Sequence, residues 1–230
     1  RLVDVPVVVV HLSSGEGYRT IQSAAEAGQK VYIETCPQYL LMDDSKYLLP
    51  GFEGAKYVCS PPLRKKEDSE ILWKALKEGR IHTIATDHCS FTTRQKEMGR
   101  EDFTKIPNGM PGVETRAALI YTYGVLQERI SLSQMCTLLA ENPARLYGLY
   151  PEKGCIQPGA DADIVVWDPE FEGRISAATQ QYNVDYAPFE GLAVKGRAEK
   201  VFLRGEIIVN NGDIIKVNQG KYIARKKGDL

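Results

Sequence analysis

The chain has 230 residues, 43% of them hydrophobic, and a formal net charge of −1 at pH 7. This near-neutral balance excludes a strongly basic surface for nucleic acid and gives no support for an anionic membrane as partner. No apolar run approaches the roughly 18 residues of a membrane-spanning helix, and no signal peptide is recognisable.

The first predicted element is a buried strand. Residues 5–12 form a continuous apolar run of mostly β-branched residues, which is typical of a parallel strand covered on both faces. A serine directly after this run can cap a helix, and Gly28 can end that helix. Residues 31–36 predict a second strand, which Pro37 stops.

The next elements continue this alternation. Residues 56–60 predict a short extended piece before two prolines, and residues 65–80 predict a helix with one apolar face. Residues 81–87 predict a third strand. Strands that alternate with helices indicate an α/β fold with a parallel sheet.

A change of character follows. Residues 88–111 read as a long polar loop, which in a compact domain is usually functional. Two helices are predicted after it, over 112–128 and 131–147, and we expect Pro143 to divide the second.

The last part of the chain predicts β-structure. Residues 163–168 read as a strand, and residues 199–215 read as a hairpin-like unit with an Asn-Asn-Gly-Asp turn. We therefore expect an α/β domain over 1–150 and mostly β-structure over 151–230.

The cysteines and the first residue add two expectations. Five cysteines are widely spaced without a CxxC pair, which favours reduced thiols in a cytoplasmic protein over a disulfide scaffold. The chain opens on Arg1 rather than Met and enters a strand-like run almost at once, so we expect it to be part of a longer protein.

Two polar residues lie where chemistry usually occurs in parallel α/β folds. His11 ends the first predicted strand and Asp87 ends the third, and active sites gather at the carboxyl ends of such strands. Imidazole and carboxylate both suit zinc. Each residue also has a simpler interpretation, since His11 can be a hydrogen-bonded structural residue and Asp87 a turn residue. A catalytic zinc takes three protein ligands and water, so these two do not complete a site.

Other polar residues stay ambiguous. Cys89 is a possible ligand, although a solitary buried thiol is commoner, and His82 reads as structural. Glu34 and Thr35 can line a pocket or satisfy backbone groups. Asn108 lies in a turn-like "IPNG" stretch and can equally present its amide to a ligand.

An ordered set of motifs carries a resemblance across essentially the whole chain. The motifs are "VVHLSS", "ETCPQYLLMDD", "GAKYVCSPPLR", "IATDHCSF", "DFTKIPNGMPGVETR", "NPARLYGLYPEKGCIQPGADADIVVWDP" and "NVDYAPFEG". Each is weak alone, but together they resemble the C-terminal half of the dihydropyrimidinase and D-hydantoinase family of cyclic amidohydrolases. Allantoinases and dihydroorotases are near relatives; Gln38 favours the hydantoinase group, because allantoinases commonly have His there.

The resemblance implies the C-terminal part of a (β/α)8 barrel of the TIM type plus part of a small β-sandwich. It also implies a binuclear zinc centre with a carboxylated lysine, whose other ligands come from strands upstream of this chain. His11 and Asp87 match metal ligands of the family. Ser60 and Asn108 match positions whose backbone groups hold the ring of the substrate.

The implied reaction opens a dihydropyrimidine or hydantoin ring to an N-carbamoyl amino acid, as in pyrimidine catabolism. The metals would lower the pKa of a bridging water, and Asp87 would accept its proton and pass it to the leaving ring nitrogen. The expected partners are a small cyclic amide or imide and further copies of the chain in a homotetramer. The alternatives are a non-catalytic adaptor that resembles the collapsin response mediator proteins, an allantoinase-type or dihydroorotase-type enzyme, and a catalytically silent fragment.

Overall fold

The computed structural model describes residues 5–230 and contains no helix there that is long and apolar enough to cross a membrane. The described residues divide into two compact units, which are considered separately. Unit 1 comprises the residues up to Arg116 together with 174–192, and unit 2 comprises 117–173 together with 193–230. The expected domains 1–150 and 151–230 stay a prediction, because these units reflect packing within this chain alone.

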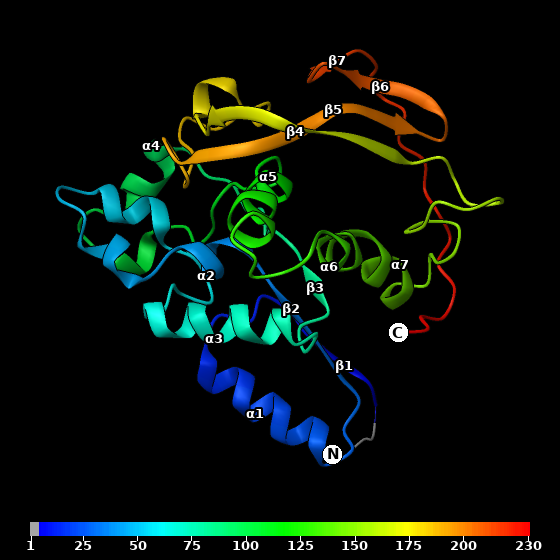
Figure 1. The fold of residues 1–230 in the computed structure, drawn as a ribbon. Helices are drawn as coiled ribbons and strands as arrows, with labels where there is room; N and C mark the ends of the chain where they lie inside the picture. The colour runs from blue at the N-terminus through cyan, green and yellow to red at the C-terminus, as the bar shows by residue number, and fades with distance from the viewer. Residues whose placement is uncertain (1–4) are drawn as a thin grey trace. The chain divides into compact units, whose positions relative to one another are not determined.

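Unit 1 contains a three-stranded parallel sheet. It is built from β1 (Val7–Val9), β2 (Val31–Thr35) and β3 (Thr83–Ile84), in the order β1-β2-β3 (Figure 1). Val9 pairs with Ile33, and Thr35 pairs with Ile84. The three predicted strands are therefore present, and their carboxyl ends lie at one edge of the sheet.

The third strand is shorter than the predicted 81–87. At its start, the ring of His82 replaces a backbone partner, since the amide of Ile33 donates to its Nδ1 at 3.0 Å. At its other end, Ala85 still donates to the carbonyl of Thr35 at 2.9 Å, and the chain then turns at Asp87 with φ 49°. The structural interpretation of His82 agrees with this bond.

The first helix forms where the serine predicts it. Helix α1 runs Gly15–Glu26, and the hydroxyl of Ser14 accepts a hydrogen bond from the amide of Gly17 at 3.1 Å. Gly28 follows with φ 88°, the left-handed conformation that ends helices. Pro37 does more than stop β2: it begins a short helix, α2 (Pro37–Leu41), because its fixed φ suits the first helical position. The sequence predicted no helix at this place.

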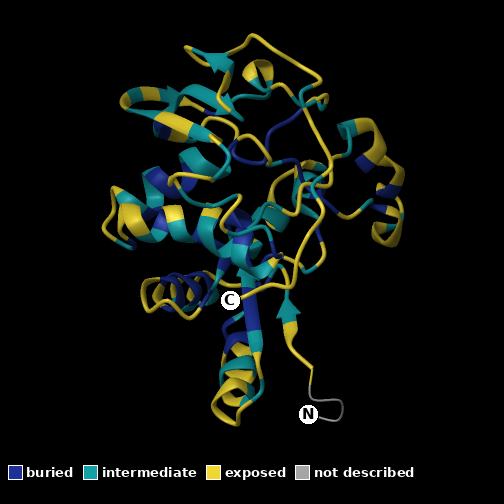
Figure 2. Cartoon of the chain, turned by 90° about the vertical axis from the view of Figure 1, so that its right-hand side faces the viewer, coloured by how far each residue is buried: buried dark blue, intermediate teal, exposed yellow. Residues whose placement is uncertain are grey.

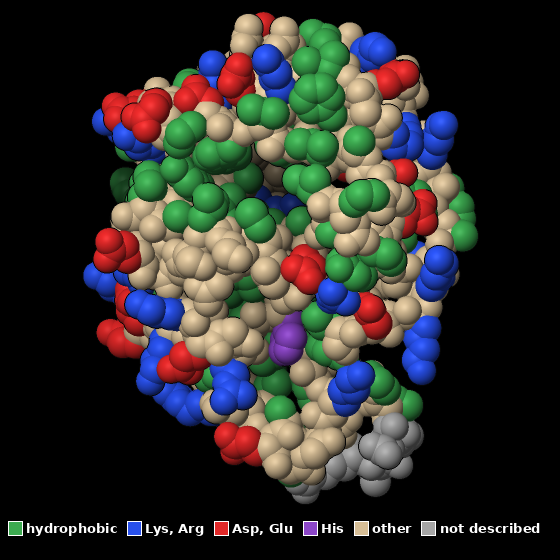
Figure 3. Space-filling view, turned by 45° about the vertical axis from the view of Figure 1, so that its right-hand side comes forward, with side chains coloured by type: hydrophobic (Ala, Val, Ile, Leu, Met, Phe, Trp, Pro, Cys, Tyr) green, Lys and Arg blue, Asp and Glu red, His purple; other side chains and the backbone are tan. Residues whose placement is uncertain are grey.

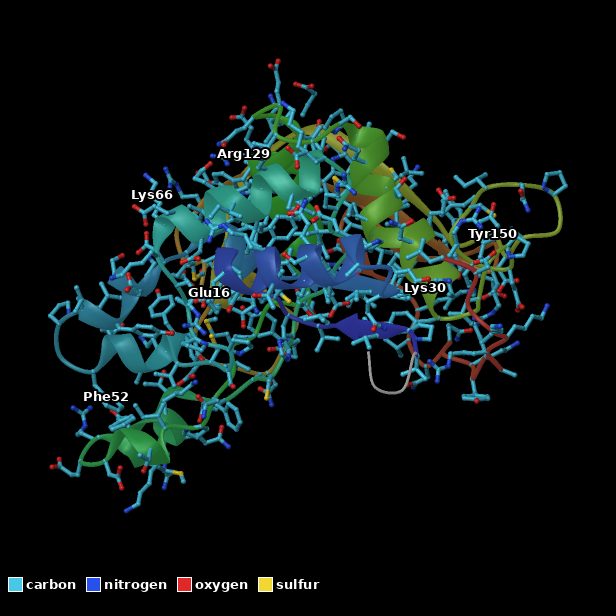
Figure 4. All side chains as sticks on the ribbon, turned by 90° about the horizontal axis from the view of Figure 1, so that it is seen from below. Glu16, Lys30, Phe52, Lys66, Arg129 and Tyr150 are labelled. Atoms are coloured by element: carbon cyan, nitrogen blue, oxygen red, sulfur yellow. The ribbon has the colours of Figure 1, made fainter. Side chains whose placement is uncertain are left out.

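Helix α3 (Lys66–Lys77) supplies much of the core of unit 1. Leu72 and Trp73 are buried on its inner face, and Ser69 Oγ and Trp73 Nε1 both donate to the carbonyl of Leu40, at 2.8 and 2.9 Å. Figure 4 labels Glu16 at the start of α1 and Lys66 at the start of α3. In Figure 2 the dark blue of buried residues marks β2, while β1 has an exposed and two intermediate residues.

Two stretches differ from the sequence prediction. The extended piece expected over 56–60 is partly wrong, because a 3₁₀ turn covers Glu53–Tyr57. The loop 88–111 is not wholly irregular: it contains the short helix α4 (Thr93–Lys96) and two 3₁₀ turns, Glu97–Gly99 and Phe103–Lys105. Thr92 and Gln95 form a capping box at the start of α4, a signal that was readable in the sequence.

Both helices predicted after the loop contain a wide turn. Helix α5 (Arg116–Ile120) continues as the π-helical turn Tyr121–Val125. Helix α6 (Leu132–Cys136) leads through a second π-helical turn, Thr137–Glu141, into α7 (Asn142–Leu146). Pro143 has no N–H group to donate a backbone hydrogen bond, and the π-helical turn lies just before it. This wide turn is the division that we expected in the second helix.

Unit 2 also contains the predicted β-structure. Strands β4 (Ile164–Arg174), β5 (Ala193–Leu203), β6 (Glu206–Asn210) and β7 (Asp213–Ile214) form one sheet in the order β4-β5-β6-β7, and the last residue of β4 belongs to unit 1. The pairs β5–β6 and β6–β7 are antiparallel. Asn211 and Gly212 both have positive φ at the predicted hairpin turn.

Candidate functional site at the strand ends of unit 1

The two predicted metal ligands occupy the carboxyl ends of the outer strands of the parallel sheet. His11 follows β1 by two residues, and Asp87 follows β3 by three. Their φ angles are 43° and 49°, and among the described residues of unit 1 these are the two non-glycine residues with positive φ. Left-handed backbone at a non-glycine residue costs free energy, and such residues gather at functional sites. The backbone angles therefore support a functional role for His11 and Asp87.

Hydrogen bonds fix these strand ends to the end of β2. Leu12 donates its amide to the carbonyl of Glu34 at 2.8 Å, and the hydroxyl of the fully buried Thr35 donates to the carbonyl of Leu12 at 2.8 Å. Gln38 donates from Nε2 to the carbonyl of Thr86 at 3.1 Å, directly before Asp87. Thr35 and Gln38 therefore hold the backbone beside the two candidate ligands.

The imidazole of His11 has an unpaired nitrogen. His11 is half-buried, and its Nδ1 is buried without a hydrogen-bond partner. Buried polar atoms in folded proteins almost always have a partner, so an orphaned imidazole nitrogen at a strand end fits a residue that binds something else. This observation favours the ligand interpretation of His11 over the structural one.

Glu34 lies in the electrostatic neighbourhood of both candidates. Burial raises the pKa of the Glu34 carboxyl, while the hydrogen bond from the Thr83 hydroxyl and the charges of His11 and Arg116 lower it, and the charge of Asp87 raises it again. Arg116 itself donates to the carbonyl of Ile84 at 2.9 Å. Glu34, Arg116 and His11 are half-buried at these strand ends, whereas Asp87 is exposed.

The donor set is only partial. Within residues 5–230 no three or more His, Cys, Asp and Glu side chains are grouped so that they could hold a metal ion. His11 and Asp87 have the right chemistry for zinc, but a complete site needs ligands beyond this pair. The Nδ1 of His88 is not available as a ligand atom, because it accepts from the amides of Gly112 and Val113, at 3.1 and 3.2 Å.

The segment that carries Ser60 is anchored by buried side chains. Cys59 Sγ and Tyr39 Oη both donate to the carbonyl of Pro61, at 3.2 and 2.9 Å, and both side chains are almost fully buried. Burial raises the pKa of Cys59 to about 11, and it also raises the pKa of Tyr39 above its usual value. Neither side chain is therefore a ready nucleophile. Ser60 itself is exposed, as a residue that meets a substrate requires.

The structure brings the Ser60, Asn108 and Asp87 segments together. The amide of Gly109 donates to the carbonyl of Val58 at 3.0 Å, which joins the Asn108 turn to the Ser60 segment. The amide of Cys89 donates to the carbonyl of Met110 at 3.1 Å, which joins the same turn to the end of β3. Asn108 is exposed, and it directly precedes the residues that make these two hydrogen bonds.

The amidohydrolase family model matches residues 8–208 of the chain. The chain belongs to the amidohydrolase family. It is 48% identical over 221 residues to a D-hydantoinase of Geobacillus stearothermophilus, an alignment that covers 95% of this chain and 47% of that enzyme. The chain therefore spans about half the length of this curated relative.

Solved structures of the family have the same fold. A D-hydantoinase from a Bacillus species is 46% identical with a TM-score of 0.97, and it covers 100% of this chain and 50% of its own. A dihydropyrimidinase from Brevibacillus agri is 45% identical with a TM-score of 0.97 and the same coverage. The resemblance to hydantoinases and the fold class, part of an amidohydrolase barrel with part of a second sheet domain, are confirmed.

Sequence reasoning missed one residue of the site region. Lys96 was not singled out, yet it is the largest fully buried side chain of the described residues. Neither a motif nor periodicity marks it, because its role depends on carbonyl groups that tertiary structure brings to it. The capping box at Thr92 was the available signal, since it predicts a helix there and thus an ordered loop.

Proposed function

We propose that the protein to which this chain belongs opens the ring of cyclic amides, dihydropyrimidines or hydantoins, to give N-carbamoyl amino acids. The family relationship supports the reaction class, since relatives are D-hydantoinases and a dihydropyrimidinase. The observation that carries the proposal is the pair His11 and Asp87, both with left-handed backbone at strand ends, one with an unpaired buried nitrogen. Hydrolysis at such a site fits the amidohydrolase family.

His11 and Asp87 are proposed to hold part of a binuclear zinc centre. The orphaned nitrogen of His11 and the carboxylate of Asp87 fit that role, and a carboxylated lysine and the remaining ligands are expected from residues upstream of this chain. When bound, the metal ions supply an acidified water and polarise the carbonyl of the ring.

The residues of this chain have separate tasks in the proposed reaction. Asp87 accepts the proton of the attacking water as the new C–O bond forms, and it returns that proton to the ring nitrogen as the C–N bond breaks. The backbone groups of Ser60 and Asn108 hold the amide of the ring in a fixed orientation, which contributes through positioning. The product keeps all atoms of ring and water as an N-carbamoyl amino acid.

The remaining proposals concern the cellular compartment, the oligomeric state and the pathway of the protein. We place the protein in the cytoplasm, a reducing compartment that suits its five free cysteines, and expect a homotetramer and a role in pyrimidine catabolism. No nucleic-acid partner is proposed; Figure 3 shows Lys and Arg interspersed with Asp and Glu on the face in view, without a basic patch.

The test is product analysis with the protein expressed at its full natural length and loaded with zinc. Dihydrouracil and hydantoin should each yield a carbamoyl product by mass spectrometry, and Asp87→Asn should lower kcat by about 10³-fold under saturating zinc, because it removes the base. Asp102→Asn is the matched control, since Asp102 caps an exposed turn through Thr104. A wild-type protein without bound metal and without turnover of any cyclic amide would contradict the proposal and favour the adaptor alternative.

A further inference from the structure

Lys96 is a buried cation whose hydrogen bonds go to backbone carbonyl groups. It is the last residue of α4, its side chain is 1% exposed, and its ring neighbour is Phe91, with Nζ 5.6 Å from the ring centroid. Nζ donates to the carbonyls of Val58, Pro107 and Gly109, at 2.9, 2.6 and 2.8 Å. All three donors of the ammonium group therefore have an acceptor, and the acceptors come from the two segments that carry Ser60 and Asn108.

These bonds orient both peptide groups of Asn108. In a trans peptide the C=O and the N–H point in opposite directions. The carbonyl of Pro107 points to Lys96, so the N–H of Asn108, in the same peptide group, points away from Lys96. The N–H of Gly109 points to the carbonyl of Val58, so the C=O of Asn108 points away from Val58.

We call the three hydrogen bonds of Lys96 Nζ to backbone carbonyls the Lys96 clamp. Asn108 presents one backbone donor and one backbone acceptor on the side opposite this clamp. Within the described part of the chain neither group has a hydrogen-bond partner. A cyclic amide carries one N–H and one C=O beside each other, so this pair matches the recognition element of such a ring. The match holds only while the two peptide groups keep their orientation.

Two further contacts confine the turn. Gly109 has φ 144°, and a Cβ there would lie 2.4 Å from the carbonyl oxygen of Cys89, so the turn packs directly against the chain two residues after Asp87. The carbonyl of Met110 accepts from the amide of Cys89 at 3.1 Å.

Lys96 keeps its charge at neutral pH. Burial lowers the pKa of Lys96 to about 8, which leaves most of the side chain protonated at pH 7. Its three carbonyl acceptors bond the charged form and so offset part of the cost of burial. An ammonium group makes three such bonds, whereas a neutral amine has only two N–H donors.

We propose that Lys96 is a positioning residue that fixes the Ser60 and Asn108 segments in the arrangement that binds the ring amide. The proposal rests on the proposed function, because it assigns the backbone of Asn108 to substrate. Lys96 does not touch the ring itself. Its effect should appear in substrate binding, since the Asn108 groups hold the ring equally in the ground state and the transition state.

The test compares Lys96→Met with Lys105→Met in the zinc-loaded protein of full natural length. Both remove a lysine charge from the same loop, but Lys105 is exposed and pairs with the side chain of Asp102 at 3.5 Å. We expect Lys96→Met to raise KM for dihydrouracil by about 10- to 100-fold, with kcat within about fivefold and unchanged zinc content. Lys105→Met should keep wild-type constants. An unchanged KM, or a fall in kcat alone, would overturn the proposal.

Hydrogen exchange followed by mass spectrometry supplies a readout that does not depend on turnover. In Lys96→Met, exchange should accelerate together in the peptides that contain 58–60 and 107–110, whereas α1 and α3 keep wild-type protection. In the wild type, bound product should protect the amide of Asn108. Accelerated exchange throughout unit 1 would show that Lys96 stabilises the fold in general and would overturn the positioning role.

A milder variant covers the case in which Lys96→Met does not fold. Lys96→Gln keeps two N–H donors, and the same KM, kcat and exchange criteria apply to it. If the wild type turns over no cyclic amide, the proposed function fails while the exchange experiment still tests the clamp. If the wild type is active and both variants match Lys105→Met, the clamp fails while the proposed function stands.

Discussion

The two units use left-handed backbone for different purposes. In unit 2, Arg204 and Asn211 have φ 51° and 53°, and each precedes a glycine in a two-residue hairpin turn that requires this conformation. Glu128 and Asn218 of unit 2 also have positive φ, outside the hairpins and outside the parallel sheet. In unit 1, His11 and Asp87 have similar angles without a hairpin, at the ends of parallel strands. The same backbone angle therefore closes a turn in one unit and places candidate ligands in the other.

Buried polar groups occur in both units but in different places. The ion pairs of unit 2 lie mostly at the surface, as between Lys216 and Glu206, whose side chains are 46% and 59% exposed. Unit 1 buries Lys96 and half-buries Glu34, and it has an orphaned nitrogen on His11.

Unit 2 also has buried nitrogens without a hydrogen-bond partner, Nε1 of Trp167 and Nε of Arg197, but the strand pairs β5–β6 and β6–β7 of its sheet are antiparallel. The difference is therefore one of position, because the orphaned nitrogen of unit 1 lies at the end of a parallel strand.

The largest expected effect tests whether the left-handed histidine is a ligand. His11→Ala in the zinc-loaded protein of full natural length should lose bound zinc, measured by mass spectrometry of the metal, and should lower kcat for dihydrouracil by at least about 10³-fold, because it removes a metal ligand. His82→Asn is the matched control, since Asn keeps an acceptor for the amide of Ile33. Full zinc content in His11→Ala would return His11 to a structural role.

The next effect concerns stability rather than chemistry. Leu72 is 0% exposed in α3, so Leu72→Ala should reduce the free energy of unfolding in urea by about 3 kcal/mol, through lost transfer energy and a residual cavity. Leu132 in unit 2 is 54% exposed, and Leu132→Ala should cost less than about 1 kcal/mol. Equal losses in the two variants would show that the core is not concentrated around α3.

The smallest effect is a pH dependence. Lys96 in the folded protein releases its proton above about pH 8, well below the usual pKa of lysine, and the neutral amine then leaves one of three carbonyls without a donor. The ratio of KM in Lys96→Met to KM in the wild type should therefore shrink a few-fold between pH 7 and pH 9.5. The ratio cancels any ionisation of the substrate. Cys59, with a pKa raised to about 11, stays a thiol in this range. A constant ratio would contradict a charged clamp.

The sequence was informative where local signals decide the structure. The valine run, the serine cap and the Asn-Gly turn correctly predicted β1, α1 and the turn between β6 and β7. The longer hairpin of β5 and β6, which turns at Arg204 and Gly205, was not predicted. The motif order also placed the chain in its family, and the strand-end rule brought His11 and Asp87 to one edge of a sheet.

Features that depend on tertiary contacts were beyond the sequence. The helix that starts at Pro37 was missed, because a proline after a strand is equally compatible with irregular chain. The role of Lys96 follows from three carbonyls that lie 11, 13 and 38 residues away along the chain. The unpaired nitrogen of His11 likewise has no signature in the sequence.

The most direct measurement of the central claim is an anomalous difference map, at the zinc absorption edge, from crystals of the metal-loaded protein of full natural length. We expect anomalous density about 2.0–2.2 Å from a ring nitrogen of His11 and from a carboxylate oxygen of Asp87. Metal density elsewhere, with His11 hydrogen-bonded to a protein group instead, would contradict the assignment of these strand ends as the metal site.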